Sequence, residues 1–506
     1  MYSRDHRFDG RFFAGIATTG IYCRPICPVS FGQPDSVQWF QSAAAAEAAG
    51  FRPCKRCRPD TSPGSSAWFG TWAVVSRALK LISEGALDGG NLEQLAERVG
   101  IGSRHLRRLF QQHLGASPLK IARSHRVLVA RNLIVDTQIP VAEIAHATGF
   151  RSIRQFNHSI RAAFGQSPTA LRRVHGTAAA RDPLAGTVVH LPYRPPFDWP
   201  SLLQFLKSRA TPGVESLEDE IYRRTVEIGG VAGAIEVRHD ARNARLSMRV
   251  LLPGCDRLMQ VVQRARRLFD LGADAVHIGS YLARDARLAG MVMAHPGLRV
   301  PGAWDGFELA VMAILGQKLD DAEQSSIIGD LVGTFGRPLD VPTPGLTHLF
   351  PQPGILAEAN LESIGVSAPR AHAIRALSKA VLAGTIAFDS VNGARDAAKQ
   401  LHSLLRLEDE TAAYIAMRAL GDPDAFFSTG MGFRKAVASH RSPVAAAEVL
   451  RIFEAYRPWR AYAAMHFWTS MRQTTRRAGP PSAARNSSAR SIQRRSRAYR
   501  RPPLRP

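Results

Sequence analysis

The chain has 506 residues, of which 45% are hydrophobic, and it carries a formal net charge of +24. That length provides for three or four domains, each with its own hydrophobic core. No apolar run reaches the length of a transmembrane helix, and the basic charge favours nucleic acid over a membrane or an acidic small molecule as the partner.

The N-terminal part of the chain holds four of its five cysteines, in two pairs. Cys23 and Cys27 lie in TTGIYCRPICP, and Cys54 and Cys57 lie in GFRPCKRCRPD. Each pair closes a tight loop, and CxxxC followed about thirty residues later by CxxC is the spacing of a zinc site with four thiolate ligands. The alternative is two disulfides. Nothing before Cys23 resembles a secretory signal, so we expect a reducing compartment and therefore zinc.

Positively charged side chains flank these thiols, more than a purely structural zinc site needs. They are Arg24, Arg52, Lys55, Arg56 and Arg58. Guanidinium groups match the geometry of phosphate and depress the pKa of nearby thiols. We therefore predict that the thiols lie against a nucleic-acid backbone, with Arg24, Lys55 and Arg56 in contact with DNA.

With these motifs, residues 4–60 resemble the zinc domain of Ada-type methylphosphotriester methyltransferases, and we assign residues 1–62 to it. The resemblance implies that all four cysteines bind zinc and that Cys23 irreversibly accepts a methyl group from a methylated DNA phosphate. Methylation would remove one unit of negative charge from the site. At about 6 Å and an effective dielectric constant near 20, that charge is worth on the order of 2 to 3 kcal/mol against one phosphate. Methylation should therefore strengthen DNA binding.

Residues 75–174 contain apolar residues at helical spacing and an internal repeat. The segment NLEQLAERVGIGSRHLRRLFQQHLGASP is followed by PVAEIAHATGFRSIRQFNHSIRAAFGQSP. In each copy a short helix leads through a glycine turn into a second helix, which is helix-turn-helix architecture. The second helices begin near Ser103 and Ser152 and carry side chains that can reach phosphates and base edges in a major groove. Those side chains are Arg104, His105, Arg107 and Arg108 in the first copy and Arg154, Gln155 and Asn157 in the second.

A single basic helix is more often only a solvated charged face, but two copies with matching apolar positions favour DNA binding. The region resembles the AraC-type DNA-binding domain, which implies two helix-turn-helix units in successive major-groove segments of double-stranded DNA. A zinc methyl acceptor joined to such a domain resembles the Ada-type sensor and transcriptional activator. That resemblance implies alkylated DNA, a promoter and RNA polymerase as partners.

Residues 174–182 are interpreted as a linker, and residues 184–298 as an α+β domain. Period-two alternation predicts strands in GTVVHLPYRPPFDW, YRRTVEIGG, GAIEVRHD and ARLSMRVLLPG. Helical spacing in LLQFLKSRA and DRLMQVVQRARRLFDL predicts helices packed on those strands. This stretch contains no catalytic spacing, and Cys255 is expected to be a buried structural thiol.

Residues 300–471 return to helical spacing, beginning with GFELAVMAILGQKLDDAEQSSIIGDLVGTFG. Together with PYRPPFDW and YRRT upstream, the stretch 186–471 resembles the AlkA-type 3-methyladenine DNA glycosylase II family of the helix-hairpin-helix superfamily. Enzymes of this family flip a damaged base into an aromatic pocket, where an aspartate assists its departure. Tyr414 and Trp468 align with aromatic pocket residues, although helical spacing would equally make them core residues.

Three functional positions depart from that family. Gly430 occupies the position of the catalytic aspartate, residues 404–412 replace a glycine-containing hairpin, and residues 316–320 replace the segment that supplies the wedge. The neighbouring Asp422 and Asp424 are interpreted as helix caps. Without a carboxylate at 430, the positive charge that develops on the sugar has no partner, which costs several kcal/mol of barrier. We therefore predict an impaired glycosylase domain.

From Arg472 to the end there are eleven arginines and no acidic residue, so residues 472–506 are expected to form a basic disordered tail. The predicted fold class is a multidomain α+β protein with a small zinc domain, an all-α double helix-turn-helix domain, an α+β domain and an all-α helix-hairpin-helix domain. We expect it in the cytoplasm, associated with the nucleoid. Three hypotheses remain: a suicide methyltransferase and activator, a bifunctional enzyme that also excises 3-methyladenine, and a zinc-containing DNA-binding regulator without chemistry.

Overall fold

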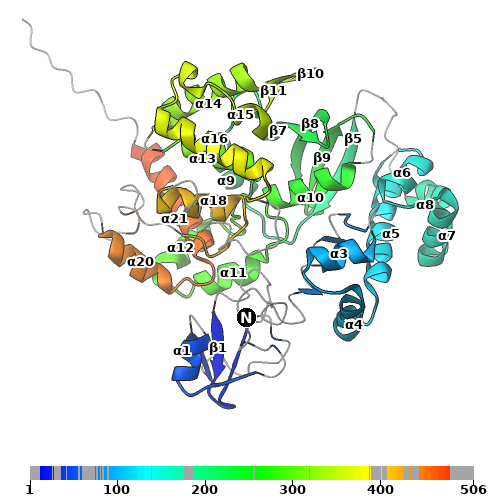
Figure 1. Ribbon diagram of the computed structural model, residues 1–506, viewed down its shortest axis with the longest axis horizontal. Helices are drawn as coiled ribbons and strands as arrows, with labels where there is room; N and C mark the ends of the chain where they lie inside the picture. Colours follow the sequence, from blue (N-terminus) through cyan, green and yellow to red (C-terminus); the bar gives the residue numbers. More distant parts are fainter. Residues whose placement is uncertain are drawn as a thin grey trace, which may run out of the picture.

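A computed structural model provides the structure of the chain (Figure 1). It describes residues 12–25, 27, 36–40, 43–54, 57, 59, 74–75, 78–79, 81–82, 85–87, 91–137, 139–175, 186–254, 257–317, 319–386, 388, 401, 407–426, 434, 437 and 444–478. Cys255 lies outside these residues, so its expected burial is not tested. No helix in the described part of the chain combines the length and the apolarity needed to cross a membrane.

The N-terminal domain is a small four-stranded sheet with one helix. Its strands are β1 (Phe13–Ile16), β2 (Ile21–Cys23), β3 (Val37–Phe40) and β4 (Arg52–Pro53), in the order β3-β1-β2-β4, and its helix is α1 (Ala43–Ala48). The Tyr22 hydroxyl donates to Glu47 Oε1 at 2.6 Å and ties β2 to the end of α1. Strands β2 and β4 pair in parallel, and the Cys54 amide donates to the Tyr22 carbonyl at 3.0 Å. Parallel pairing therefore brings the two cysteine pairs to one end of the sheet.

The DNA-binding region consists of two similar helical units. They are formed by α3 (Leu92–Arg98), α4 (Ser103–Leu114), α5 (Pro118–Asp136), α6 (Val141–Ala147), α7 (Ile153–Phe164) and α8 (Pro168–His175). A capping box between Asn91 and Gln94 starts α3, and Ser152 caps α7. The predicted second helices of the repeat are therefore present as α4 and α7. Helix α5 also packs against strand β5 of the following domain, so the core of the second unit continues into the next sheet.

The next domain is a five-stranded antiparallel sheet covered by helices. The strands β5 (Thr187–Pro192), β6 (Glu215–Glu218), β7 (Ile221–Ile228), β8 (Val231–Asp240) and β9 (Arg245–Leu251) have the order β5-β9-β8-β7-β6. The α9 (Trp199–Lys207) and α10 (Leu258–Leu268) helices contribute buried apolar side chains to the core of this sheet. Each alternating segment predicted as a strand contains one, although in GTVVHLPYRPPFDW the strand ends at Pro192 and α9 begins at Trp199. The period-two pattern missed β6, because its sequence ESLE has too few apolar residues to signal a strand.

The remaining elements form a mainly helical domain. It includes residues 275–294, which were predicted to belong to the α+β domain, because their buried side chains share a core with the C-terminal helices. Its helices are α11 (Ala275–Leu282), α12 (Ala286–Ala294), α13 (Gly306–Leu315), α14 (Asp321–Phe335), α15 (Pro353–Leu356), α16 (Ala368–Leu382), α18 (Asp409–Arg418), α20 (Ala446–Glu454) and α21 (Arg460–Ala478). The hairpin of β10 (Arg337–Thr343) and β11 (Leu346–Leu349) corrects the expectation of an all-α domain. Its turn contains Gly345 at φ +74°, a backbone conformation that suits glycine.

Helix α21 continues past the expected start of the tail at residue 472 and ends at Ala478. The segment RQTTRRA continues the helix because arginine, glutamine and alanine are good helix formers, and Gly479-Pro480 follows it. Residues 479–506 lie outside the described part of the chain. The predicted multidomain fold class is confirmed, with a small four-stranded domain, two helix-turn-helix units, an antiparallel α+β domain and a mainly helical domain.

Candidate metal centre, DNA-binding helices and glycosylase-like pocket

The four cysteines form one buried cluster. Cys23, Cys27, Cys54 and Cys57 place their sulfur atoms within 4.8 Å of one another, and the Sγ atoms of Cys27 and Cys54 are 3.9 Å apart. All four are free thiols, so the structure does not support the two-disulfide alternative. At 1% exposure, Cys23 is more deeply buried than Cys54, which is 7% exposed. The spacing of the cysteines in the sequence thus corresponds to a single site.

The donor set of this cluster fits zinc. Contact with the thiols of Cys27, Cys54 and Cys57, together with burial, raises the pKa of the Cys23 thiol. A buried group of thiolates needs a compensating cation, because like charges in a low-dielectric site repel one another. Zinc takes four sulfur ligands in tetrahedral geometry and deprotonates them when it binds. The protein is accordingly a zinc protein.

The basic residues beside the thiols do not all face solvent. Arg24 is fully buried, its backbone amide donates to Cys57 Sγ at 3.3 Å, and its Nη1 donates to the Cys57 carbonyl at 3.3 Å. In the described conformation, Arg24 therefore holds the two cysteine loops together and does not display the guanidinium group expected to contact DNA. Arg52 on β4 is exposed. Lys55 and Arg56 lie outside the described residues, so their contacts with DNA stay a prediction.

The predicted DNA-binding side chains of the helix-turn-helix units lie on the surface. One side of α4 is buried and carries Leu106, Leu109 and Phe110. The matching side of α7 is also buried and carries Phe156 and Ile160. The residues Arg104, His105, Arg107, Arg108, Arg154, Gln155 and Asn157 are all exposed. They are thus available for contact with phosphates and base edges, which stays a prediction for each residue.

Two predicted pocket residues lie in the aromatic core where α9, α18 and α21 meet. The rings of Trp468 and Phe205 have their centroids 6.3 Å apart, and Arg418 Nη1 donates to the Tyr414 hydroxyl at 2.7 Å. The guanidinium groups of Arg418 and Arg209 lie 5.2 and 4.2 Å from the Phe205 ring. Sequence reasoning did not identify these last three residues, because only the tertiary structure brings α9 next to α18.

The two arginines change the electrostatics of that cluster. Burial by itself raises the pKa of the Tyr414 hydroxyl. The positive charges of Arg418 and Arg209 lower this pKa by more than burial raises it, so the net shift is downward. Arg418 also donates to the carbonyls of Pro301 and Gly302, at 3.1 and 2.8 Å. Tyr414 therefore interacts with two cationic side chains. Its position is compatible both with a core residue and with the predicted pocket residue.

The segment interpreted as a replaced hairpin is acidic where the structure describes it. Glu408 is the N-cap of α18, and Asp409 and Glu410 occupy its first turn. Carboxylates stabilise the positive end of a helix dipole, but at that end they oppose the approach of a phosphate. Gln317 Nε2 donates to Thr411 Oγ1 at 2.9 Å, so the segment predicted to occupy the place of the wedge lies beside this turn. Gly430, Lys318 and residues 404–406 lie outside the described residues.

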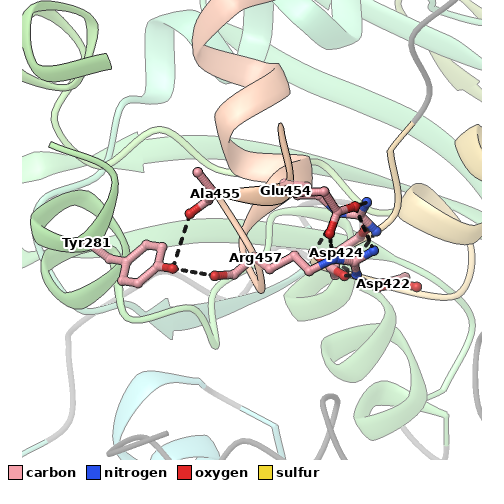
Figure 2. Close-up of polar contacts among 7 residues, drawn as sticks. Tyr281, Asp422, Asp424, Glu454, Ala455 and Arg457 are labelled. Carbon is pink, nitrogen blue, oxygen red and sulfur yellow. Dashed lines mark hydrogen bonds and ion pairs between the residues drawn. The ribbon is translucent and has the colours of Figure 1, made fainter. Parts of the chain in front are cut away.

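Asp424 forms a buried ion-pair cluster, which corrects its interpretation as a helix cap. Its carboxylate pairs with Arg457 (Figure 2). It also accepts from Arg460 Nε and Nη2 at 2.8 and 3.0 Å. Glu454 joins the cluster through the same two arginines, and Tyr281 donates to the carbonyls of Arg457 and Ala455. Asp422 does act locally, because its Oδ1 accepts from the Asp424 amide at 2.8 Å. The cluster joins the segment after α18 to the start of α21.

Replacing Asp424 with alanine is expected to destabilise the helical domain by about 3 to 5 kcal/mol, because it leaves the largely buried Arg460 with only the half-exposed carboxylate of Glu454. The Asp424 side chain is 4% exposed and that of Arg460 is 13% exposed. Hydrogen exchange of α21 in the full-length protein would measure the loss. Glu454→Ala is the matched control and should cost at most about 1 kcal/mol, since that carboxylate is 46% exposed. Equal effects of both variants would contradict the assignment.

Together, a four-cysteine zinc domain, paired helix-turn-helix units and a glycosylase-like module define a DNA-binding repair and regulatory protein. Three family models match the chain: the metal binding domain of Ada over residues 1–60, a helix-turn-helix domain over 95–174 and the AlkA N-terminal domain over 188–305. A probable bifunctional transcriptional activator/DNA repair enzyme AlkA from Mycobacterium tuberculosis is 40% identical over 477 residues, which are 93% of this chain and 95% of that protein. The chain therefore belongs to this family of bifunctional transcriptional activators and DNA repair enzymes.

Other similar proteins match parts of the chain. DNA-3-methyladenine glycosylase 2 of Escherichia coli is 30% identical over 283 residues, which are 55% of this chain and 95% of that protein. The bifunctional transcriptional activator/DNA repair enzyme Ada of Escherichia coli is 29% identical over 185 residues, which are 37% of this chain and 51% of that protein. Among solved structures, a methylated N-ADA/DNA complex is 34% identical with a TM-score of 0.15, and covers 25% of this chain and 91% of that one.

Proposed function

We propose that Cys23 accepts a methyl group from a methylphosphotriester in DNA, once per protein molecule, and that the methylated protein activates transcription of repair genes. The four-thiol cluster supports this proposal most directly, because it lies in the same chain as two helix-turn-helix units with exposed basic faces. At the promoter, in the cytoplasm, the protein would act together with RNA polymerase.

In the proposed transfer, the sulfur of Cys23 attacks the methyl carbon of the phosphotriester. A sulfur–carbon bond forms while the bond between that carbon and the phosphate oxygen breaks, and the electron pair stays on the oxygen as a phosphodiester anion. Bound zinc would keep the sulfur deprotonated at neutral pH while leaving it nucleophilic. The product is a thioether, which has no good leaving group, so each protein molecule reacts once.

The same transfer changes how the domain meets DNA. It converts an anionic thiolate into a neutral thioether, so one unit of repulsion against the phosphates is lost. By Coulomb's law, the repulsion between one unit charge and one phosphate is on the order of 2 to 3 kcal/mol at about 6 Å and an effective dielectric constant near 20. Methylation of Cys23 would therefore convert a weak DNA-binding protein into a tighter one.

We further propose that the glycosylase-like module is catalytically impaired. Gly430 stands at the expected catalytic position, and Glu408, Asp409 and Glu410 surround the start of α18, where a DNA phosphate would approach. An active bifunctional enzyme is the second candidate. The contact between Phe205 and Trp468 and the placement of Tyr414 favour it, because aromatic side chains stack on a flipped base. The third candidate is a regulator in which Cys23 is only a ligand.

Incubation with DNA that carries methylphosphotriesters, followed by intact-protein mass spectrometry, tests these candidates. The expected result is a single added methyl group that peptide mapping assigns to Cys23. Bases released from a methylated duplex are collected from the same reaction, and no free 3-methyladenine is expected. Free 3-methyladenine would establish the second candidate, and an unmodified protein would leave only the regulator.

A further inference from the structure

The two recognition helices match in length and register. Helices α4 and α7 have 12 residues each, and each ends at a glycine in the left-handed conformation, Gly115 at φ +67° and Gly165 at φ +71°. Gly102 and Ser152 are their N-caps. Each residue of α4 therefore has one counterpart in α7, starting with Ser103 and Ile153, and the two helices can be compared position by position.

The exposed side chains at matching positions differ in chemistry. Arg104 and Arg154 are the same and Arg108 corresponds to His158, but three positions near the start of the helix carry amide or apolar groups in α7. The changed pairs are Ser103 and Ile153, His105 and Gln155, and Arg107 and Asn157. At these three positions α4 carries Arg107, which lies 4.0 Å from Glu93, whereas α7 carries neutral groups beside Arg154 that can distinguish one base from another.

The first turn of α7 also projects further from the protein than that of α4. Every residue from Arg151 to Gln155 is exposed, and the Ile153 side chain is 42% exposed. The corresponding Ser103 on α4 is half-buried. In helix-turn-helix proteins the N-terminal residues of the second helix are those that meet base edges. An isoleucine at this place is apolar surface that gains by contact with another apolar group.

The chemistry of these α7 groups matches one kind of base pair. Asparagine and glutamine pair with the N6 and N7 atoms of adenine, and an apolar side chain packs on the methyl group of thymine. Ile153 and Asn157 are four residues apart and share one face of the helix, so they can meet neighbouring base pairs. Arginine suits phosphate or guanine, and α4 has three exposed arginines in its first two turns where α7 has only Arg154.

We infer that α7 selects A·T base pairs in its half of the binding site, and that Ile153 is a specificity residue that packs on a thymine methyl group. The inference depends on the sequence-specific promoter binding proposed above and does not depend on methyl transfer to Cys23. The α4 arginines then contribute mainly affinity that depends on salt.

The test begins with selection of binding sites from random double-stranded DNA by the full-length protein. Thymine is then replaced by uracil, which lacks only the methyl group, at each selected A·T position. The wild-type protein should bind about fourfold more weakly at one of these positions, the value of one buried methyl group. Ile153→Ser, which installs the α4 residue, should bind the thymine and uracil forms equally. Ile153→Val, which keeps a branched apolar side chain, should still bind the thymine form more tightly than the uracil form.

Arg108→Ala on α4 is the matched control. It should weaken binding to all sequences alike and reduce the dependence on salt by about one phosphate contact, while the thymine preference persists. The inference is overturned if no A·T position is selected, or if Ile153→Ser still distinguishes thymine from uracil. Failure of methyl transfer would alter none of these ratios, because each compares two DNA molecules bound by the same form of the protein.

Discussion

Cys23→His is expected to abolish methyl uptake while the protein keeps its zinc, because histidine nitrogen can replace one thiolate in a tetrahedral site but cannot accept the methyl group as cysteine sulfur does. The wild-type protein should gain on the order of 30- to 150-fold in DNA affinity after reaction, the equivalent of 2 to 3 kcal/mol. The variant should show no such gain. Metal analysis, intact mass and DNA binding before and after exposure to methylphosphotriester DNA measure the three properties.

The fifth cysteine provides the matched control for this experiment. Cys255 lies outside the zinc cluster in the sequence, so Cys255→Ser should bind zinc, accept one methyl group and gain DNA affinity as the wild-type protein does. A methyl group found on Cys23→His would place the acceptor at another cysteine. If the wild-type protein is methylated without any gain in DNA affinity, the methyl transfer is supported. The predicted loss of repulsion against the DNA phosphates is then contradicted.

Gly430→Asp is expected to create or raise glycosylase activity. A carboxylate at the expected catalytic position would stabilise the positive charge that develops on the sugar, and such a term is worth about 100-fold or more in rate. We expect the wild-type protein to release 3-methyladenine no faster than buffer. The rate of 3-methyladenine release is measured in single turnovers with saturating protein, so that weak DNA binding at the acidic start of α18 does not limit the rate.

A second glycine close to position 430 controls for the added charge. Gly432→Asp places the same carboxylate two residues away in the same segment, where it should not assist the reaction. Efficient base release by the wild-type protein would show that another group replaces the missing aspartate. Equal activity of the Gly430→Asp and Gly432→Asp variants would show that position 430 has no special role.

Much of the candidate metal centre and of the DNA-binding domain could be predicted because the signals are local. Two short cysteine loops define a set of four ligands, and the structure brings those four sulfur atoms together. The repeated helix-turn-helix pattern depends on helical spacing and a glycine turn within each copy, and α4 and α7 begin where that pattern places them. Residue roles in DNA contact and methyl transfer stay predictions.

Other features depended on contacts between distant parts of the chain. The sequence around Arg24 suggests that its side chain is exposed and contacts DNA. The packing of the two cysteine loops instead buries the Arg24 side chain against Cys57. Asp424 has the local signature of a cap, yet arginines more than thirty residues later take its carboxylate. Neither outcome has a local sequence signal, because each depends on which segments meet in space.

By itself, the sequence determined the order of the domains' motifs, the zinc ligand set and the repeated DNA-binding units, since chain closure over short loops and helical periodicity are encoded by neighbouring residues. Only the tertiary structure decided that Phe205 and Arg209 join Arg418 beside Tyr414 and Trp468, and that a β-hairpin interrupts the helical domain. Burial and ion pairing depend on three-dimensional packing, which brings together residues that are far apart in the chain.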